Sequence, residues 1–146
     1  MKALIQRVKK ASVAVDGKIV GEIGKGILVF LGIGKDDSDK QISYLVDKIV
    51  NLRIFENESK KMDLSLTDLK GELLIISQFT LYGNVKNGRR PDFIDAAKPE
   101  TAKGLYEKFI NECKKHGFKT ESGVFGAMME IELINDGPVT FMIESE

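Results

Sequence analysis

A continuous apolar run, GILVFLGI, spans residues 26–33 and has a glycine at or near each end. The run is too short for a typical helix, but it fits a strand whose two faces are both buried inside a sheet. A second run of this kind, ELLIISQFT, spans residues 72–80 and follows the Lys70-Gly71 turn. The sequence therefore predicts a sheet with two buried strands and with the 26–33 strand at its centre.

Shorter segments rich in β-branched residues, or with alternating apolar and polar residues, predict the other strands. Asp16-Gly17 is a hairpin signal, so the first strands should form a meander. Near the C-terminus, alternation occurs on both sides of Asp136-Gly137-Pro138. The predicted strands are residues 2–8, 12–16, 19–23, 53–56 and 64–66, followed by one strand with Ile131 and Leu133 on one face and another with Val139, Phe141 and Ile143 on one face.

Two segments predict amphipathic helices. Ser38 and Gln41 form a capping box, whereas Pro99 suits the first turn of the second helix and Gly117 suits its end. Gly104 inside the second helix costs ~1 kcal/mol relative to alanine, so we expect close packing there. The apolar stripes are Ile42, Leu45, Val46 and Ile49, and then Ala102, Leu105, Tyr106, Phe109, Ile110 and Cys113. These elements predict an α+β fold with a mostly antiparallel, strongly curved sheet and two main helices.

Size and charge limit the classes of protein to consider. With 146 residues, 42% of them apolar, the chain is expected to form a single domain over residues 1–146. Its 22 basic and 22 acidic residues cancel, so any contact with nucleic acid must be local. The start, MKALIQRVKK, lacks the apolar centre of a signal peptide, and no run approaches the ~20 residues of a membrane span. We therefore expect a cytoplasmic protein without a membrane partner, and the lone Cys113 suits a reducing compartment.

The usual catalytic motifs are missing from the sequence. The chain has one histidine and one cysteine, and it has no Walker loop, dinucleotide fingerprint or zinc-binding helix motif. His116 lies at a predicted helix end, where the helix dipole explains it, and Cys113 continues an apolar stripe. Thr80 offers a hydroxyl, but no base that would activate it is identifiable. Covalent catalysis is therefore disfavoured.

The stretch SQFT, residues 77–80, puts polar side chains directly after a buried strand. On one interpretation, the hydroxyl groups satisfy backbone groups where the strand emerges. On the other, Ser77, Gln78 and Thr80 face a small polar ligand. The residues by themselves leave both interpretations open.

Two further stretches have the same ambiguity. The polar loop 83–97 contains Lys86, Arg89 and Arg90, which either are solvated or contact phosphates. Residues 123–129, GVFGAMM, either pack at a bend of the core or let a base or ribose approach the glycines and the aromatic ring.

Taken together, these stretches resemble the D-aminoacyl-tRNA deacylase (D-Tyr-tRNA deacylase) family. The motifs are ALIQRVKKASV at 3–13, SQFTLY at 77–82, G-x-R-P-x-F at 88–93, G-x-F-G-A-x-M at 123–129 and NDGPVTF at 135–141. In this order they cover nearly the whole chain, and the SQFT and GPVT pair is the specific signal. One departure is Lys60-Lys61-Met62, where the family pattern has Gly-Lys-Met.

The resemblance implies a barrel-like homodimer with active sites at the subunit interface and with no metal or organic cofactor. It implies hydrolysis of the ester between a D-amino acid and the 3′-terminal adenosine of tRNA, with glycine on tRNA-Ala also accepted and L-amino acids rejected. Gly137 and Pro138 would form a cis peptide that reaches into the other subunit's site and excludes L side chains. Arg7 would brace this segment through bonds to backbone carbonyl groups.

The resemblance also assigns the remaining site residues. Ser77, Gln78, Phe79 and Thr80 would form the catalytic wall, where the Phe79 and Thr80 N–H groups polarise the ester carbonyl while the ribose 2′-hydroxyl activates or positions water. Phe125, Gly126, Ala127 and Met129 would bind the adenosine, and Lys86, Arg89 and Arg90 would bind tRNA phosphates. The rival hypothesis is a non-enzymatic RNA-binding or protein-interaction module.

Overall fold

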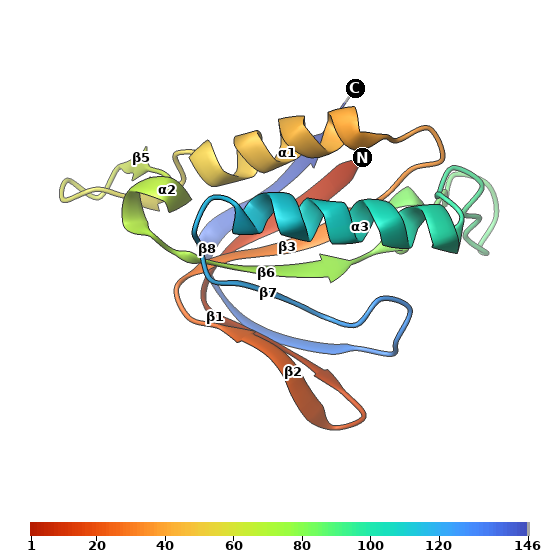
Figure 1. Ribbon diagram of the computed structural model, residues 1–146, viewed down its shortest axis with the longest axis horizontal. Helices are drawn as coiled ribbons and strands as arrows, with labels where there is room; N and C mark the ends of the chain where they lie inside the picture. Colours follow the sequence, from red (N-terminus) through yellow and green to blue (C-terminus); the bar gives the residue numbers. More distant parts are fainter. Residues whose placement is uncertain (146) are drawn as a thin grey trace.

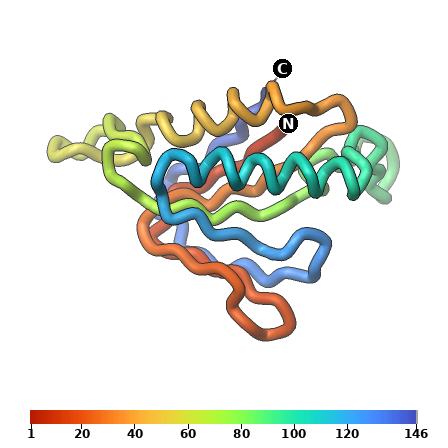
Figure 2. The backbone as a smooth tube through the Cα atoms, in the orientation of Figure 1, coloured from red at the N-terminus to blue at the C-terminus, as the bar shows by residue number. Residues whose placement is uncertain are grey.

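A computed structural model describes residues 1–145 of the chain (Figures 1 and 2). Its main sheet contains six strands: β1 (Lys2–Val15), β2 (Lys18–Ile23), β3 (Gly26–Gly32), β6 (Glu72–Ser77), β7 (Thr120–Ser122) and β8 (Glu130–Glu144). The helices are α1 (Asp39–Asn51), α2 (Leu66–Leu69), α3 (Pro99–Lys114) and the 3-10 helix η1 (Phe79–Tyr82). A small second sheet pairs β4 (Phe55–Glu56) with β5 (Met62–Leu64).

The main sheet is mixed, and the long strand β1 organises it. Strands β2, β3 and β8 all pair with β1 in antiparallel fashion. The β3–β6 and β6–β7 pairs are parallel, because α1 connects the first pair and α3 the second. The sheet curls until β2 lies beside β7: a Cβ added at Gly21 would lie 2.8 Å from the Ser122 carbonyl oxygen. The α+β class and the curved, barrel-like sheet are as predicted.

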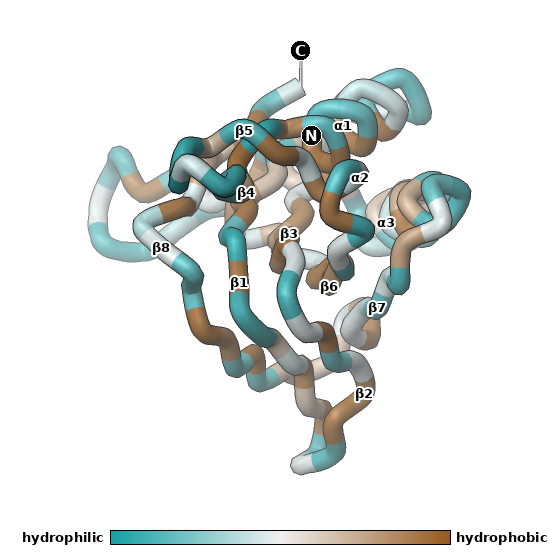
Figure 3. Tube along the Cα trace, turned by 90° about the vertical axis from the view of Figure 1, so that its left-hand side faces the viewer, coloured by the Kyte–Doolittle hydropathy of each residue, from teal (hydrophilic) through white to brown (hydrophobic). Residues whose placement is uncertain are grey.

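Both faces of β3 are buried, as its continuous apolar run predicts. Ile27, Val29 and Leu31 join the core beneath α1 and α3, while Leu28 belongs to a second core on the opposite face of the sheet. Figure 1 shows α1 and α3 over one face of the sheet, and Figure 3 shows the hydrophobic stretches of β3 and β6 in the interior. The predicted stripes of both helices are buried, Cys113 included.

Local signals explain where the helices begin. The Ser38 N–H donates to Gln41 Oε1 at 2.9 Å in the predicted capping box of α1, and Pro99 is the first residue of α3. A second capping box, at Ser65 and Asp68, begins α2. The prediction of a strand at residues 64–66 is therefore wrong from Ser65 onward, because this box starts a helix.

Other strands also differ from the prediction, mainly because pairing with distant strands outweighs the local pattern. Residues 2–8 and 12–16 form one continuous strand, since β8 pairs with β1 along both halves. The two predicted C-terminal strands are likewise one strand, β8, with an irregularity at its middle. The strand predicted for 72–80 ends at Ser77, where the chain turns into η1, and β7 was not predicted.

Several turns have left-handed backbone. Asp16 and Gly17 have φ of 50° and 76°, as the predicted two-residue hairpin turn demands. Lys60 has φ of 57°, in the region that favours glycine. The lysine that departs from the family pattern thus lies at a position whose backbone conformation favours glycine. Within residues 1–145, no helix is both long enough and apolar enough to cross a membrane.

The expected close packing at Gly104 is not observed. The residue is exposed on α3, and a Cβ added there would have no atom within 4 Å. We predict that Gly104→Ala raises the free energy of unfolding by about 0.5–1 kcal/mol, because alanine restricts the unfolded chain and favours the helix. Urea unfolding followed by circular dichroism measures this change.

Gly26→Ala is the opposing control, because its Cβ would lie 1.9 Å from the Glu72 carbonyl oxygen and must destabilise the protein. A lower unfolding free energy in Gly104→Ala would show that another surface packs closely against this part of α3.

Candidate functional site

A cavity of about 760 Å³ opens where β6 ends. Its lining includes Ser77, Gln78, Phe79 and Thr80 on one side and Phe125, Gly126, Ala127 and Met129 on another. Two stretches separated by more than forty residues in the sequence therefore meet around one space. The rest of the lining consists of Ile33, Phe93, Ala96, Ala97, Pro99, Ala102, Met128 and Ile131.

The SQFT stretch owes its shape to the change from strand to 3-10 helix. The Gln78 N–H donates to the Leu31 carbonyl at 2.8 Å, which extends the parallel pairing by one residue. The Leu81 N–H then donates to the Gln78 carbonyl at 3.3 Å and begins η1. The Gln78 side-chain amide donates to Thr80 Oγ1, so these two polar groups are held beside each other. Phe79 is 55% exposed, and its ring packs edge-on against Phe93 with 4.9 Å between centroids.

Tyr106 of α3 supports the wall formed by residues 125–129. Its hydroxyl donates to the Ile75 carbonyl at 2.7 Å, and its ring centroid lies 5.8 Å from that of Phe125. Burial raises the pKa of Tyr106 to about 12, so the hydroxyl stays protonated and keeps donating at neutral pH. The sequence identified Tyr106 only as part of an apolar stripe, because nothing in the pattern reveals the partner of its hydroxyl.

Small residues that the sequence did not indicate as part of a site complete the cavity. Ala96, Ala97 and Ala102 lie around the start of α3, and their short side chains leave the space open. The only signal for this wall was the unusual length of the 83–97 loop, which includes Phe93 and leads into Pro99.

The lining of the cavity is electrically neutral. Over residues 1–145, the side chains that line it include hydroxyl, amide, aromatic and aliphatic groups but no Asp, Glu, His, Cys, Lys or Arg. In the same part of the chain, no group of three His, Cys, Asp or Glu residues is arranged to hold a metal ion. Cys113 is buried in the core, and burial raises the pKa of its thiol to about 12. His116 stacks on Phe118 with a centroid distance of 6.0 Å. The cavity can therefore orient and hydrogen-bond a ligand, whereas its lining lacks a side chain suited to accept a proton at neutral pH.

The basic residues Lys86, Arg89 and Arg90 do not line the cavity. All three are exposed in the 83–97 loop. Asn84 and Asp92 close this part of the loop by exchanging backbone hydrogen bonds of 2.8 and 3.1 Å. The three cations thus lie in a loop whose later residues, from Phe93 to Ala97, contribute to the cavity wall.

Arg7, Gly137 and Pro138 form a separate region. In the pairing of β8 with β1, Asn135 lies opposite Val8 and Thr140 lies opposite Gln6. The four residues 136–139 therefore form an excursion opposite Arg7 alone. The Gly137-Pro138 peptide bond within this excursion is cis, and both residues are exposed.

Arg7 ties the excursion to the rest of the fold. It is 4% exposed; its Nε donates to the Asp136 carbonyl at 2.8 Å and its Nη1 to the Ile54 carbonyl at 2.6 Å. The Asp136 and Glu56 carboxylates lie 3.5 and 4.0 Å from the guanidinium. From the other side, Asn135 Nδ2 donates to the carbonyls of Arg7 and Val139 at 3.0 and 3.1 Å. A buried cation and an amide therefore hold both ends of an exposed segment.

The excursion lies far from the cavity of its own chain. Arg7 pairs with Ile27 and Ile27 with Leu73, whereas Ser77 lies four residues further along β6, or about 13 Å. β8 is also separated from β6 by β1 and β3, which adds three strand spacings of about 4.8 Å. Neither Gly137 nor Pro138 lines the cavity among the described residues. One chain therefore keeps its predicted catalytic wall and its predicted selecting segment apart.

Comparison with known sequences relates nearly the whole chain to one family. The family model described as D-Tyr-tRNA(Tyr) deacylase matches residues 4–144. A D-aminoacyl-tRNA deacylase of Fusobacterium nucleatum subsp. nucleatum is 61% identical over 146 residues, covering 100% of this chain and 97% of that protein. One of Thermosipho africanus is 57% identical over 146 residues, with coverage of 100% and 98%.

Two solved structures share the fold. The protein named c-Myc DNA Unwinding Element Binding Protein matches with a TM-score of 0.94 at 44% identity, covering 100% of this chain and 99% of its own. A probable eukaryotic D-amino acid tRNA deacylase matches with a TM-score of 0.85 over 97% of each chain. At 20% identity, this second match is a likeness of fold alone.

The contacts of Arg7 predict that lysine cannot replace it. Lysine carries the charge but lacks the planar fork that reaches the Asp136 and Ile54 carbonyls together, so one buried acceptor loses its partner. We expect Arg7→Lys to lower the free energy of unfolding by about 1.5–3 kcal/mol in urea titrations.

Arg53→Lys is the matched control. Arg53 also donates to a carbonyl and a carboxylate, both of Asp63, but its side chain is 67% exposed, so we expect a loss of less than about 1 kcal/mol. Equal losses at the two positions would show that the Arg7 fork contributes nothing specific.

Proposed function

The chain belongs to the D-Tyr-tRNA(Tyr) deacylase family and is a D-aminoacyl-tRNA deacylase, a hydrolase. We propose that the ester of D-aminoacyl-tRNA is hydrolysed in the neutral cavity, and that a second copy of the chain excludes L-amino acids from this cavity. The observation that carries the proposal is the combination of a cavity without ionisable side chains and a braced, exposed Gly137-Pro138 segment remote from it.

The neutral lining supports a mechanism in which the substrate supplies the reactive hydroxyl group. Ester hydrolysis needs a group that positions or activates water, and Ser77, Gln78 and Thr80 are not bases at neutral pH. In our proposal the 2′-hydroxyl of the terminal ribose, next to the ester, performs this role. The protein then accelerates the reaction mainly by orienting the ester, an effect worth up to ~7–11 kcal/mol.

The start of η1 suits the stabilisation of a developing oxyanion. Its first hydrogen bond is the one that the Leu81 N–H donates, so the Phe79 and Thr80 N–H groups precede the hydrogen-bonded turn. We assign these two N–H groups to the ester carbonyl, where each donor is typically worth ~3–4 kcal/mol in the transition state. The wall of Phe125, Gly126, Ala127 and Met129 would then hold the terminal adenosine.

Chiral selection follows from a rigid wall rather than from a side chain. The Gly137-Pro138 segment is held at both ends by Arg7 and Asn135, so it cannot easily move aside for a side chain of the wrong hand. Because it lies far from the cavity of its own chain, we assign it to the cavity of a second copy. Ile134, Phe141 and Met142 of β8 are 46%, 41% and 47% exposed, which supports a homodimer that covers them. A monomer in analytical ultracentrifugation would contradict this shared site.

The basic loop would contact the body of the tRNA. Lys86, Arg89 and Arg90 are exposed near the cavity wall, and a chain with no net charge needs a local set of cations to bind phosphates. A protein that acts on aminoacyl-tRNA would work in the cytoplasm, where translation uses this substrate.

The rival hypothesis is a binding protein without hydrolytic activity. One structural relative is named for binding to DNA, and a basic loop suits nucleic-acid binding of either kind. Binding alone does not explain why a neutral cavity and a braced backbone wall should be combined. Multiple turnovers of D-aminoacyl-tRNA would separate the two hypotheses.

The decisive measurement uses catalytic amounts of the purified protein with D-Tyr-tRNA, L-Tyr-tRNA and Gly-tRNA(Ala). We expect multiple turnovers of the D-aminoacyl and glycyl substrates, and hydrolysis of the L-isomer no faster than in buffer, because glycine has no side chain for the wall to reject. If neither D-Tyr-tRNA nor L-Tyr-tRNA is hydrolysed, the enzymatic function is refuted. If both are hydrolysed at the same rate, the role of the wall is refuted.

The mechanism predicts that a hydroxyl of the substrate matters more than that of Thr80. We expect Thr80→Ala to keep kcat within about tenfold of the wild-type value. The variant retains the backbone N–H of residue 80, and loss of a side-chain hydroxyl should cost less than loss of an oxyanion donor. A substrate ending in 2′-deoxyadenosine should be cleaved at least a hundredfold more slowly at the same ester position. An acyl group trapped on Thr80, or normal cleavage of the deoxy substrate, would overturn this assignment.

A further inference from the structure

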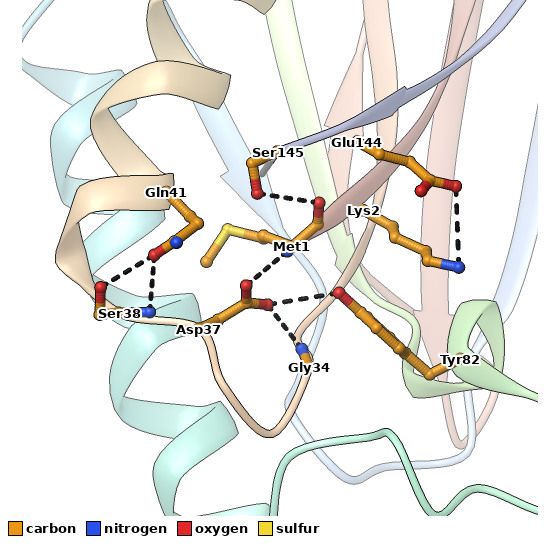
Figure 4. A network of polar contacts seen from close by, with 9 residues as sticks. All are labelled: Met1, Lys2, Gly34, Asp37, Ser38, Gln41, Tyr82, Glu144 and Ser145. Carbon is orange, nitrogen blue, oxygen red and sulfur yellow. Dashed lines mark hydrogen bonds and ion pairs between the residues drawn. The ribbon is translucent and has the colours of Figure 1, made fainter.

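Asp37, in the turn after β3, is the centre of a polar cluster outside the cavity (Figure 4). Its Oδ1 lies 2.5 Å from the terminal ammonium of Met1. Its Oδ2 accepts hydrogen bonds from the Gly34 N–H at 2.6 Å and from the Tyr82 hydroxyl at 3.4 Å. We call Met1, Gly34, Asp37 and Tyr82 the Asp37 cluster.

The cluster is largely shielded from water. The side chains of Met1 and Asp37 are 0% and 9% exposed. Removing one partner of such a pair leaves the other charge buried without compensation, which makes the pair sensitive to substitution. Ser145 fixes the neighbouring backbone, because its N–H and hydroxyl both donate to the Met1 carbonyl, at 3.0 and 3.1 Å.

The Tyr82 ring packs closely against Gly34 within this cluster. A Cβ at Gly34 would lie 2.8 Å from the Tyr82 hydroxyl, so only glycine allows the ring to pack this closely. Lys2 Nζ covers the ring at 4.9 Å from its centroid. Burial raises the pKa of Tyr82, and the negative charge of Asp37 raises it further, so the hydroxyl remains a donor.

Through Tyr82 the cluster reaches the catalytic wall. Tyr82 is the last residue of η1, the single 3-10 turn that also contains Phe79 and Thr80. The Gly83 N–H donates to the Thr80 carbonyl at 2.9 Å, which closes this turn. A shift of the Tyr82 ring would therefore move the peptide units that we assign to the oxyanion.

Through Gly34 the cluster reaches two more walls of the cavity. Ile33, which precedes Gly34, lines the cavity, and its carbonyl accepts the Ala97 N–H at 2.9 Å. Gly34 forms an isolated bridge with Ala96, and the Lys35 N–H donates to the Asp95 carbonyl at 3.0 Å. The walls at Ile33, at Ala96 and Ala97, and at η1 all depend on the turn that Asp37 stabilises.

We propose that Asp37 is a positioning residue for the deacylation reaction: it sets the place of η1 and of the Ala96-Ala97 wall without touching the substrate. The inference rests on the proposed function of the cavity. It differs from a purely structural role, because it requires a loss of catalytic rate in a protein that is fully folded. A small misplacement of groups that orient an ester is enough to lower the rate about a hundredfold.

The test compares Asp37→Asn with two matched variants. Asp39→Asn makes the same chemical change two residues later, at an exposed carboxylate that pairs with Lys108 at 2.8 Å. Ile49→Ala removes buried volume from α1 and loses stability without altering the cluster. All are assayed on D-Tyr-tRNA, well below their melting temperatures.

We expect Asp37→Asn to lower kcat by about 10- to 100-fold with KM changed less than about threefold. In ¹H–¹⁵N spectra the amide signals of Thr80 and Ala97 should shift in this variant. Asp39→Asn and Ile49→Ala should retain the wild-type kcat and leave these two signals in place. An unchanged kcat in folded Asp37→Asn, or an equal loss of kcat in Ile49→Ala, would overturn the proposal.

Tyr82→Phe provides a second route if Asp37→Asn does not fold. It keeps the ring and removes only the hydroxyl, so we expect a severalfold loss of kcat and a shift of the Thr80 amide signal. In the Asp37→Asn background, the same change should add nothing, because the two groups act as one unit. A wild-type kcat in Tyr82→Phe would count against the cluster. Inactive wild-type protein would instead refute the proposed function.

Discussion

Strand β1 pairs along both of its edges, and this double pairing organises the whole fold. On one edge it pairs with β3 and β2, and on the other with β8, so a single strand connects the chain ends, the central strand and the hairpin. Lys2 pairs with Glu144, so the start of β1 and the end of β8 lie side by side at the end of this ladder (Figure 1). The same ladder places Arg7 opposite the 136–139 excursion and Met1 beside Asp37. Backbone hydrogen bonds thus fix both regions of the proposed site, one at the start of β1 and the other near its middle.

The chemistry divides between a neutral cavity and charged groups outside it. Arg7 and Asp37 are both largely buried, and each binds backbone groups that shape a wall. Neither lines the cavity. In the site that we propose, the protein contributes oriented N–H groups and rigid surfaces, and the largely buried side chains of Arg7 and Asp37 hold these surfaces from behind. The proposed reaction therefore depends on geometry more than on proton transfer by side chains.

Much of the secondary structure followed from local rules. The run at 26–33, the Asp16-Gly17 turn and the Ser38–Gln41 box each correspond to an observed element, because burial on two faces, left-handed backbone and a capped helix have direct sequence signals. Except at Ser65, where a local capping box was overlooked, the errors arose where distant partners decide. Residues 9–11 are strand because β8 and β2 lie beside them, and Gly104 is exposed because no other part of the described chain packs on that side of α3. The candidate residues of SQFT and of 123–129 were chosen by resemblance, and the residues alone left their roles open.

The two main helices, the buried central strand, the zero net charge and the lack of ionisable residues suited to the usual catalytic schemes follow from composition and from spacing along the chain. Which residues share a cavity and which do not depends on the tertiary structure. Arg7 and Ser77 lie far apart, and Met1 touches Asp37, because strand order and register set distances that no local pattern encodes. The neutrality of the cavity is likewise a property of the fold: this chain is 30% charged, and packing alone kept every charge out of that lining.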